Sequence, residues 1–300
     1  MSQKLDYLPA EESFLNPESV DAGYPGSARP VVIPFGLEAS VSYGSGTATG
    51  PAAILAASHQ IEMYDEELGR EPYREFGIAA VREPVIQRPI EAALDQLAGL
   101  VDTVADAGKF PFVLGGEHSL TIGAVRPLAQ RHPGLVVVQF DAHADLRDGY
   151  QGEPNSHAAA MRRVLDLPGV SLVSIGIRAL SQPEAQFAEE NRDRVTIHYA
   201  KDQARWDIEA IVAPLANRPV YVTFDIDALD AAIMPATGTP TPGGLGYWQA
   251  LSILRRVCSA GNVVGADLVE FAPIKGLHAF DYTAAAIAYK MMSYALSKRT

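Results

Sequence analysis

The sequence predicts a single-domain α/β fold in which helices cover both faces of a mostly parallel, eight-stranded sheet, giving three α/β/α layers. Short apolar runs typical of strands buried on both faces alternate with amphipathic stretches, as in parallel sheets with crossover helices. No internal repeat or low-complexity linker divides the 300 residues. Segments rich in carboxylates and imidazoles come from both halves of the chain, which also favours one domain.

Eight apolar runs are candidates for buried strands. In chain order they span residues 30–35, 76–81, 111–114, 135–140, 171–177, 195–198, 219–224 and 263–268. Between most of them, apolar residues recur at helical spacing. The clearest predicted helices span residues 90–107, 119–131, 157–167, 183–191, 208–216, 247–258 and 283–296. Residues 1–28 lack such periodicity, and we interpret them as an N-terminal extension that wraps the domain of residues 29–300 or a neighbouring subunit.

Composition and charge exclude several classes of protein. The formal charge is -12 and Lys and Arg are scattered, which argues against a nucleic-acid partner and favours a small cationic one. The only cysteine, Cys258, rules out an intrachain disulfide, and we interpret it as a buried structural thiol. The first residues have no signal-peptide character, and the chain has no apolar run of about 18 residues. We therefore expect a cytoplasmic protein with no membrane partner.

The segment FDAHAD at residues 140–145 follows an apolar run directly. In an extended backbone Asp141, His143 and Asp145 share one parity and project to the same side, while the two alanines between them occupy little room. Ligands in open α/β sheets bind outside the carboxyl ends of the strands. The segment is therefore a candidate for holding a cation at such an end.

Two further segments repeat this placement. Asp225 and Asp227 stand two residues apart at the end of the run 219–224. His118 follows Gly115 and Gly116, which allow a tight turn, and Ser119 is in a position to cap the next helix.

The combined set contains two imidazoles and four carboxylates, which favours Mn²⁺ or Mg²⁺ and leaves Zn²⁺, Co²⁺ and Fe²⁺ open. Its members are His118, Asp141, His143, Asp145, Asp225 and Asp227. Taken singly, aspartates at strand ends more often cap helices or form turns. Together they would repel one another unless cations were present, so we expect two divalent ions.

A fourth segment places His157 just beyond these residues, at the start of a predicted helix. Because imidazole titrates near neutral pH, His157 is a candidate proton carrier. The other histidines lie outside any metal-like spacing, and we interpret them as structural. They are His59, His132, His198 and His278.

These segments together resemble the ureohydrolase superfamily of arginases and agmatinases. In family order they are GGEHS (115–119), DAHAD (141–145), SH (156–157), TFDIDALD (223–230), PATGTP with GGL (235–245) and DLVEFAP (267–273). The resemblance spans about residues 30–296 and implies an eight-stranded parallel sheet with two Mn²⁺ per subunit. It implies a homotrimer or a homohexamer.

The resemblance also implies a role for each site residue. One Mn²⁺ would bind His118, Asp141, Asp145 and Asp225, and the other would bind Asp141, His143, Asp225 and Asp227. Glu270 would hold a substrate guanidinium, and a hydroxide bridging the metals would attack its carbon. Asp145 and His157 are candidates for passing a proton to the departing amine, so that urea and an amine result.

The loop 146–156 resembles the form found in agmatinases, DAHxD...YxGxxxSH. It carries Asp148 and Glu153 against a single Arg147, which favours a second positive charge on the substrate. We therefore expect agmatine, cleaved to urea and putrescine in polyamine biosynthesis, with Arg147, Asp148, Asn155 and His157 as candidate substrate contacts.

Other functions remain open from the sequence. Arginine or guanidinobutyrate would use Arg147 or Asn155 as carboxylate partners. A diverged homologue could bind metal or polyamine without turnover, and a deacetylase-like amidohydrolase would use one Zn²⁺.

Overall fold

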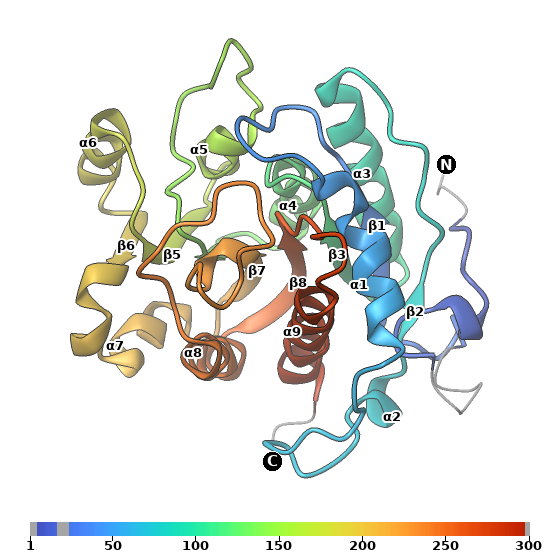
Figure 1. Cartoon of the computed structure of the whole chain (residues 1–300). Helices are drawn as coiled ribbons and strands as arrows, with labels where there is room; N and C mark the ends of the chain where they lie inside the picture. Colours follow the sequence, from blue (N-terminus) through green and yellow to red (C-terminus); the bar gives the residue numbers. More distant parts are fainter. Residues whose placement is uncertain (1–4, 17–23, 298–300) are drawn as a thin grey trace.

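The computed structural model describes residues 5–16 and 24–297 and contains one eight-stranded sheet in the order β2-β1-β3-β8-β7-β4-β5-β6 (Figure 1). Every pair of neighbouring strands is parallel. The strands are β1 (Pro30–Phe35), β2 (Ala79–Ala80), β3 (Phe110–Gly115), β4 (Val136–Phe140), β5 (Ser171–Ile177), β6 (Val195–Tyr199), β7 (Pro219–Asp225) and β8 (Asn262–Val269). The predicted α/β fold with a parallel eight-stranded sheet is confirmed.

The prediction for residues 76–81 is wrong in extent. Tyr73–Phe76 forms the short helix α2, and Gly77 ends it with a positive φ of 59°. Only Ala79 and Ala80 pair with β1 as strand β2. Phe76 is buried as part of the helical turn, so its apolar character reflects burial and not strand structure.

The predicted helices are present with shifted ends. The α-helices are α1 (Gly50–Ser58), α2, α3 (Ile90–Asp106), α4 (Leu120–Arg131), α5 (Ala160–Leu165), α6 (Gln182–Glu190), α7 (Ile208–Val212), α8 (Tyr247–Ala260) and α9 (Ala279–Leu296). The predicted helix 157–167 begins as the 3-10 turn η4 (His157–Ala159), and 208–216 ends in the 3-10 turn η6 (Ala213–Leu215). Among the described residues, no helix has both the length and the apolar character needed to cross a membrane.

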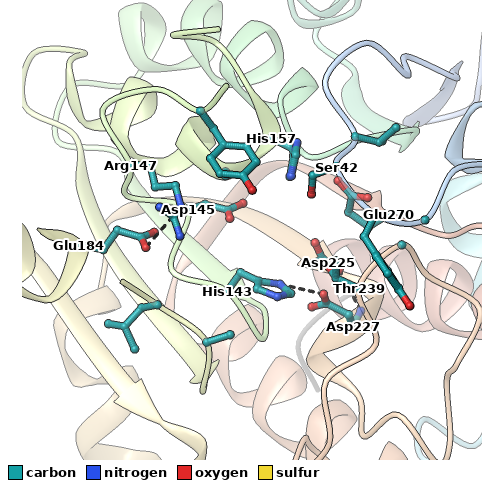
Figure 2. A pocket seen from close by; sticks show the side chains of 18 residues that line it. Ser42, His143, Asp145, Arg147, His157, Glu184, Asp225, Asp227, Thr239 and Glu270 are labelled. Atoms are coloured by element: carbon teal, nitrogen blue, oxygen red, sulfur yellow. Dashed lines mark hydrogen bonds and ion pairs between the residues drawn. The ribbon is translucent and has the colours of Figure 1, made fainter. Parts of the chain in front are cut away.

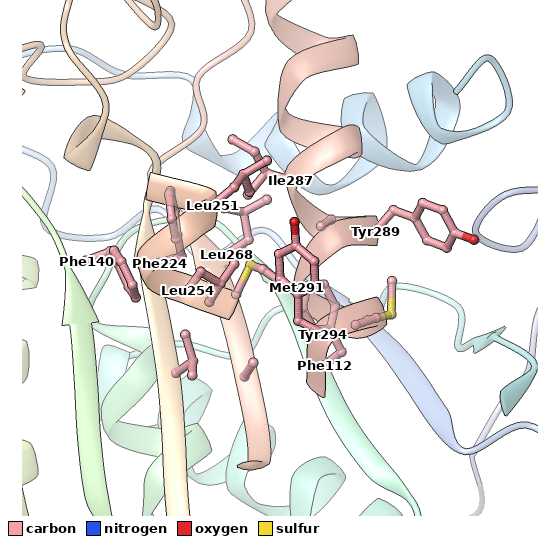
Figure 3. Close-up of a cluster of buried hydrophobic side chains, with 14 of the residues drawn as sticks. Phe112, Phe140, Phe224, Leu251, Leu254, Leu268, Ile287, Tyr289, Met291 and Tyr294 are labelled. Carbon is pink, nitrogen blue, oxygen red and sulfur yellow. The ribbon is translucent and has the colours of Figure 1, made fainter. Parts of the chain in front are cut away.

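One face of the sheet is covered by α8 and α9 (Figure 3). Phe140 and Phe224 stack from adjacent strands with ring centroids 5.2 Å apart. Against the strands pack Leu251 and Leu254 of α8 and Met291 of α9. Cys258 of α8 is buried in the same cluster, which confirms the interpretation of a buried thiol.

The opposite face is covered by α3, α4 and α5. Leu94, Leu97 and Val101 of α3 pack with Val125 and Leu128 of α4 against this side of the strands. Successive strand residues point to opposite faces, and both faces are covered by helices. All six residues of β1 are therefore buried. This explains why its sequence is a continuous apolar run.

The described part of the N-terminal extension packs on its own domain. Tyr7 pairs with Val81 in an antiparallel bridge, and Leu8 donates a backbone hydrogen bond to Ala80. Phe14 and Leu15 are buried in the core, and the backbone N–H of Leu15 donates to Ser58 Oγ at the end of α1. Residues 1–4 and 17–23 lie outside the described residues, and a domain boundary at residue 28 stays a prediction.

The centre of the sheet decides where the chemically active residues meet. Strands β3, β8, β7 and β4 are consecutive in space although far apart in the chain. His118, Glu270, Asp225 and Asp141 lie at or just beyond the carboxyl ends of these four strands. Because the strands are parallel, all four ends lie at the same edge of the sheet.

Candidate metal centre

The loops beyond the strand ends enclose a cavity of about 360 Å³ (Figure 2). Its lining comes from the segments that follow β1, β4, β5, β7 and β8. The residues are Val41, Ser42, Tyr43, Gly44, His143, Asp145, Arg147, Tyr150, His157, Ala158, Ala179, Leu180, Glu184, Asp225, Asp227, Gly238, Thr239 and Glu270. Most of the predicted site residues therefore surround one space.

His118 is at the centre of a first group of possible metal ligands. Its Nδ1 lies 3.1 Å from Asp141 Oδ2, 3.0 Å from Asp145 Oδ2 and 3.4 Å from Asp225 Oδ2. The His118 ring is 1% exposed, and the three carboxylates are buried as well. Residues from three separate segments thus converge on one point.

His143 is at the centre of a second group. Its Nδ1 lies 2.9 Å from Asp227 Oδ2 and 3.6 Å from Asp141 Oδ1, and Figure 2 shows the ring directed at Asp227. Asp141 belongs to both groups, with one oxygen facing each imidazole. This arrangement suits a carboxylate that bridges two cations.

The backbone that presents Asp145 differs from the expected extended segment. Asp145 has a φ of 53°, a left-handed conformation that is uncommon for a residue other than glycine. Common parity along a strand therefore does not explain how all three side chains meet. The chain turns at Asp145 and brings its carboxylate back toward His118.

The Gly-Gly turn before His118 is also explained differently from the prediction. A Cβ at Gly116 would lie 2.0 Å from the carbonyl oxygen of Leu37, and one at Gly115 would lie 2.4 Å from Leu120. These glycines permit a close approach of chain segments. Ser119 does not cap α4 as expected, because its hydroxyl donates to Glu117 Oε1 at 2.5 Å.

Hydrogen bonds from outside each group orient the possible ligands. His118 Nε2 lies 2.8 Å from Thr223 Oγ1, which leaves Nδ1 to face the carboxylates. Gln139 donates to Asp141 Oδ2, and the backbone N–H of Ala142 donates to Asp227 Oδ1. Such second contacts fix ring and carboxylate orientation in metal sites.

Arg178 ties together the loops that carry these residues. Its guanidinium donates to the carbonyl oxygens of Asp227, Leu229 and Thr241, and further to Gly176 and Pro242. Asp230, the last aspartate of TFDIDALD, accepts from the backbone N–H groups of Ala232, Gly243 and Gly244. Asp230 therefore stabilises turns, as aspartates near strand ends commonly do.

Burial and like charges perturb the pKa values at this site. Burial, with the neighbouring carboxylates of Asp227 and Asp141, raises the pKa of Asp225 well above its ordinary value. Burial by itself would lower the pKa of His143, but Asp227 and Asp141 outweigh it and raise the pKa to about 12. Burial would raise the pKa of Asp141, yet His118 and His143 lower it. Without cations, protons must therefore balance the charge of the carboxylates.

The donor set fits two divalent cations. Carboxylate oxygens and imidazole nitrogens are ligands that Mn²⁺ accepts. His118 Nδ1 is buried and makes no well-aligned hydrogen bond, although three carboxylate oxygens surround it. A cation at this point would occupy the place where a nitrogen and three oxygens converge.

Glu270 stands beside the first group. Its backbone φ is 62°, and its N–H donates to the carbonyl of Gly116. Its Oε1 accepts from the backbone N–H of His118 at 2.6 Å. Burial raises the pKa of Glu270 to about 8. A cation in the cavity would favour the charged form of this carboxylate.

His157 lines the cavity and is held by residues that sequence reasoning missed. Its backbone N–H donates to Ser40 Oγ at 2.9 Å, and its Nδ1 lies 3.2 Å from the same oxygen. The Ser40 hydroxyl also lies 2.8 Å from Glu117 Oε1. The Tyr150 ring meets the His157 ring edge-on at 6.0 Å. Ser40 belongs to no motif of the sequence, and Glu117 stands in GGEHS without an assigned role, so their contact with His157 is identified only by the packing.

The structure places only one of the predicted substrate contacts between residues 147 and 155 at the cavity. Arg147 lines the cavity, where its Nε lies 3.7 Å from Glu184 Oε2 (Figure 2). Its guanidinium lies over the Tyr150 ring. Asp148 and Asn155 are not among the lining residues. Asp148 instead accepts from Arg163 at 2.7 Å, and Glu153 accepts from the backbone N–H of Asn155. Substrate contacts by Asp148 and Asn155 therefore stay predictions.

Several lining residues carried no strong signal in the sequence. Glu184 forms the capping box of α6 with Ser181, and its other oxygen accepts from the backbone N–H of Leu146. The pattern SQPE at 181–184 could have identified this cap, but not its place beside Arg147. Tyr43 is 87% exposed at the rim, on a loop whose Gly44 packs directly against Gly238.

Comparison with known proteins gives a consistent result. A sequence model described as "Arginase family" matches residues 28–296. N(1)-aminopropylagmatine ureohydrolase of Synechocystis sp. is 38% identical over 292 residues, covering 94% of both chains. Agmatinase of Bacillus anthracis is 37% identical over 270 residues, covering 89% of this chain and 88% of its own. The solved agmatine ureohydrolase of Thermoplasma volcanium is 31% identical, with a TM-score of 0.81 and 90% coverage of both chains.

Proposed function

The chain belongs to the arginase family, and from this premise we propose that it hydrolyses the guanidino group of agmatine to urea and putrescine. The observation that carries this proposal is the pair of overlapping His/Asp groups at the base of a cavity that Glu270 also lines. Two relatives matched over most of their length are named N(1)-aminopropylagmatine ureohydrolase and agmatinase, which supports this reaction type.

The cations in this proposal are two Mn²⁺ ions. His118, Asp141, Asp145 and Asp225 would hold one, and Asp141, His143, Asp225 and Asp227 the other. When bound, they would supply Lewis-acid chemistry that lowers the pKa of water at the site. The remaining steps depend on the side chains of this chain.

Glu270 is the proposed partner of the substrate guanidinium. A buried carboxylate makes strong charge-assisted hydrogen bonds to a planar guanidinium, and this fixes the guanidinium carbon over the metal ligands. Glu270 is 9% exposed, so little water competes for its oxygens. Because the guanidinium is held in place, the addition of water to its carbon becomes effectively unimolecular.

His157 and Asp145 are the proposed proton carriers. The C–N bond of the tetrahedral intermediate breaks only when the departing amine takes up a proton. Both side chains line the cavity, Asp145 next to His118 and His157 on the loop beyond it. A proton held at His157 Nε2 can reach the amine nitrogen as the bond breaks.

The cavity offers little to an anionic tail on the substrate. Asp145, Asp225 and Asp227 are assigned to the cations and Glu270 to the guanidinium, which leaves Arg147 as the one lining guanidinium. Glu184 lies against Arg147 and offsets its charge. An α-carboxylate on the substrate would find only this partly neutralised group.

A second candidate substrate is an agmatine that carries an aminopropyl group. The relative from Synechocystis sp. is named for this activity and covers 94% of the chain. The exposed Tyr43 at the cavity rim offers a ring face for an additional ammonium group. The same guanidinium site would serve both substrates.

Parallel urea assays test the proposal. Mn²⁺-loaded protein is incubated with agmatine, N(1)-aminopropylagmatine, arginine and guanidinobutyrate, and kcat/KM is measured for each. We expect agmatine to give the highest value. A higher value for N(1)-aminopropylagmatine would replace agmatine by the extended substrate, and a higher value for arginine would contradict the argument from cavity charge. Absence of urea with all four would refute the reaction itself.

Metal content provides an independent measurement. We expect about two Mn²⁺ per chain after loading, as a binuclear site requires. A single Zn²⁺ would favour the deacetylase-like alternative. Assembly as a trimer or hexamer and a cytoplasmic location stay predictions.

A further inference from the structure

Ser40 connects a buried carboxylate to the proposed proton carrier. It lies in the loop after β1, 117 residues before His157 in the chain. Its Oγ is 2.8 Å from Glu117 Oε1, 2.9 Å from the backbone nitrogen of His157 and 3.2 Å from His157 Nδ1. One hydroxyl therefore has three polar neighbours, two of which belong to His157.

Glu117 fixes the loop after β1 by accepting hydrogen bonds from it. It is completely buried and accepts four hydrogen bonds, from the backbone N–H groups of Ala39 and Ser40 and the hydroxyls of Ser40 and Ser119. Both backbone contacts are 2.6 Å long. A carboxylate surrounded by donors acts only as an acceptor.

Counting protons determines the direction of each bond. A serine hydroxyl has one hydrogen and two lone pairs. Because Glu117 only accepts, the hydroxyl hydrogen points to it, and one lone pair accepts from the backbone N–H of His157. The second lone pair is left for His157 Nδ1, which must then carry a hydrogen.

We propose that Ser40, anchored by Glu117, is a positioning residue that holds His157 as its Nδ1–H tautomer and leaves Nε2 to exchange protons in the cavity. This inference rests on the proposed function for its catalytic meaning, because a proton carrier needs its free nitrogen directed at the departing amine. Neutral histidine in water favours the opposite tautomer, with the hydrogen on Nε2. The Ser40 contact reverses that preference.

Ser40→Ala tests the proposal with little disturbance of the loop. It removes the hydroxyl, while the backbone N–H groups at positions 39 and 40 can still donate to Glu117. We expect kcat for urea release to fall about tenfold with KM changed less than about threefold, because the proton carrier and not guanidinium binding is affected. Ser40→Thr keeps the hydroxyl and is expected to retain kcat within about threefold of wild type.

Ser45→Ala is the matched control. Ser45 is an exposed residue of the same loop and does not line the cavity. We expect its kcat to equal that of wild type. Ser40→Ala with wild-type kcat, or Ser40→Thr as slow as Ser40→Ala, would overturn the proposal.

A spectroscopic measurement reads the tautomer without activity. Solid-state ¹⁵N spectra of histidine-labelled, Mg²⁺-loaded protein at mildly alkaline pH distinguish protonated from unprotonated ring nitrogens, and His157→Asn identifies the relevant signals. We expect Nδ1–H in wild type and Nε2–H in Ser40→Ala. Nε2–H in wild type, or the same tautomer in both proteins, would overturn the inference.

The two measurements separate this inference from the proposed function. If wild-type protein releases no urea from any guanidino compound, the proposed function fails, and the ¹⁵N spectra still decide whether Ser40 sets the tautomer. If wild type is active and both the spectra and kcat are unchanged in Ser40→Ala, the proposed function stands and Ser40 is not a positioning residue.

Discussion

Thr223→Val removes the hydrogen-bond partner of a proposed metal ligand with little change of shape. Thr223 Oγ1 lies 2.8 Å from His118 Nε2, and both side chains are essentially inaccessible to water. A cation at Nδ1 uses the lone pair of that nitrogen, so the ring hydrogen must sit on Nε2. In the variant this N–H would face a methyl group.

The expected loss follows from that burial. An unpaired buried donor costs about 1–3 kcal/mol, and loss of an outer contact to a metal-bound histidine weakens metal binding about 10–100-fold. These ranges agree, since each tenfold change corresponds to about 1.4 kcal/mol. The metal-free variant should lose stability as well. Burial lowers the pKa of His118, but Asp141, Asp145 and Asp225 outweigh it and raise the pKa, so the ring keeps a hydrogen on Nε2.

Competition with a chelating dye measures the Mn²⁺ affinity, and urea denaturation in excess chelator measures the stability of the metal-free protein. Thr223→Ser is the control, because it keeps the hydroxyl and should bind Mn²⁺ within about threefold of wild type. Wild-type affinity in Thr223→Val would refute the reasoning, as would equal weakening by serine and valine.

Three further predictions concern the same site. Glu270→Gln should lower kcat/KM for urea release at least about 100-fold without changing Mn²⁺ content, because the amide has no charge to hold a guanidinium. Parallel assays of urea and of bound metal check this prediction. A loss of metal in proportion to the loss of activity would contradict it. The free energy of unfolding of the metal-free protein should fall as pH rises from about 5 to about 8. In the folded protein the pKa of Glu270 is raised from 4.5 to about 8, and the pKa values of Asp225 and His143 are raised as well. The folded protein therefore binds more protons than the unfolded chain in this range, and it loses this advantage as pH rises. Denaturation curves in chelator at three pH values measure this slope, and stability that rises with pH would contradict it. Arg178→Ala should lower the free energy of unfolding by about 3 kcal/mol, because five carbonyl groups lose a charged donor; Arg178→Lys should recover part of the loss, and an unchanged denaturation midpoint for alanine would show that water replaces these bonds.

Local sequence predicted those parts of the fold that depend on local burial. The runs 30–35 and 171–177 coincide with β1 and β5, because strands buried on both faces are mostly apolar. The run 76–81 failed because burial alone does not distinguish a helical turn from a strand, and Phe76 is buried in the turn of α2. Residue type and spacing also pointed to the possible metal ligands, because carboxylates gathered in one place repel one another unless cations are present.

Other features of the site depend on contacts that have no local pattern. Ser40 belongs to no motif, and Glu117 stands in GGEHS without an assigned role; only the passage of the loop after β1 across His157 brings them together. Asp148 was assigned to the substrate from its charge, and only the structure shows that its carboxylate accepts from Arg163, fifteen residues later; its contact with the substrate stays a prediction. The charge of a loop residue does not by itself predict which group its side chain contacts.

The sequence by itself determined a parallel α/β sheet, a set of six possible metal ligands and a resemblance to one superfamily. Only the tertiary structure decided that β8 and β7 lie between β3 and β4, and this order brings His118 within 3.4 Å of carboxylates at two other strand ends. It also decided that Asp145 reaches His118 through a left-handed turn. The physical reason is that periodicity records which face of an element is buried, whereas strand order and loop conformation arise from packing between distant segments.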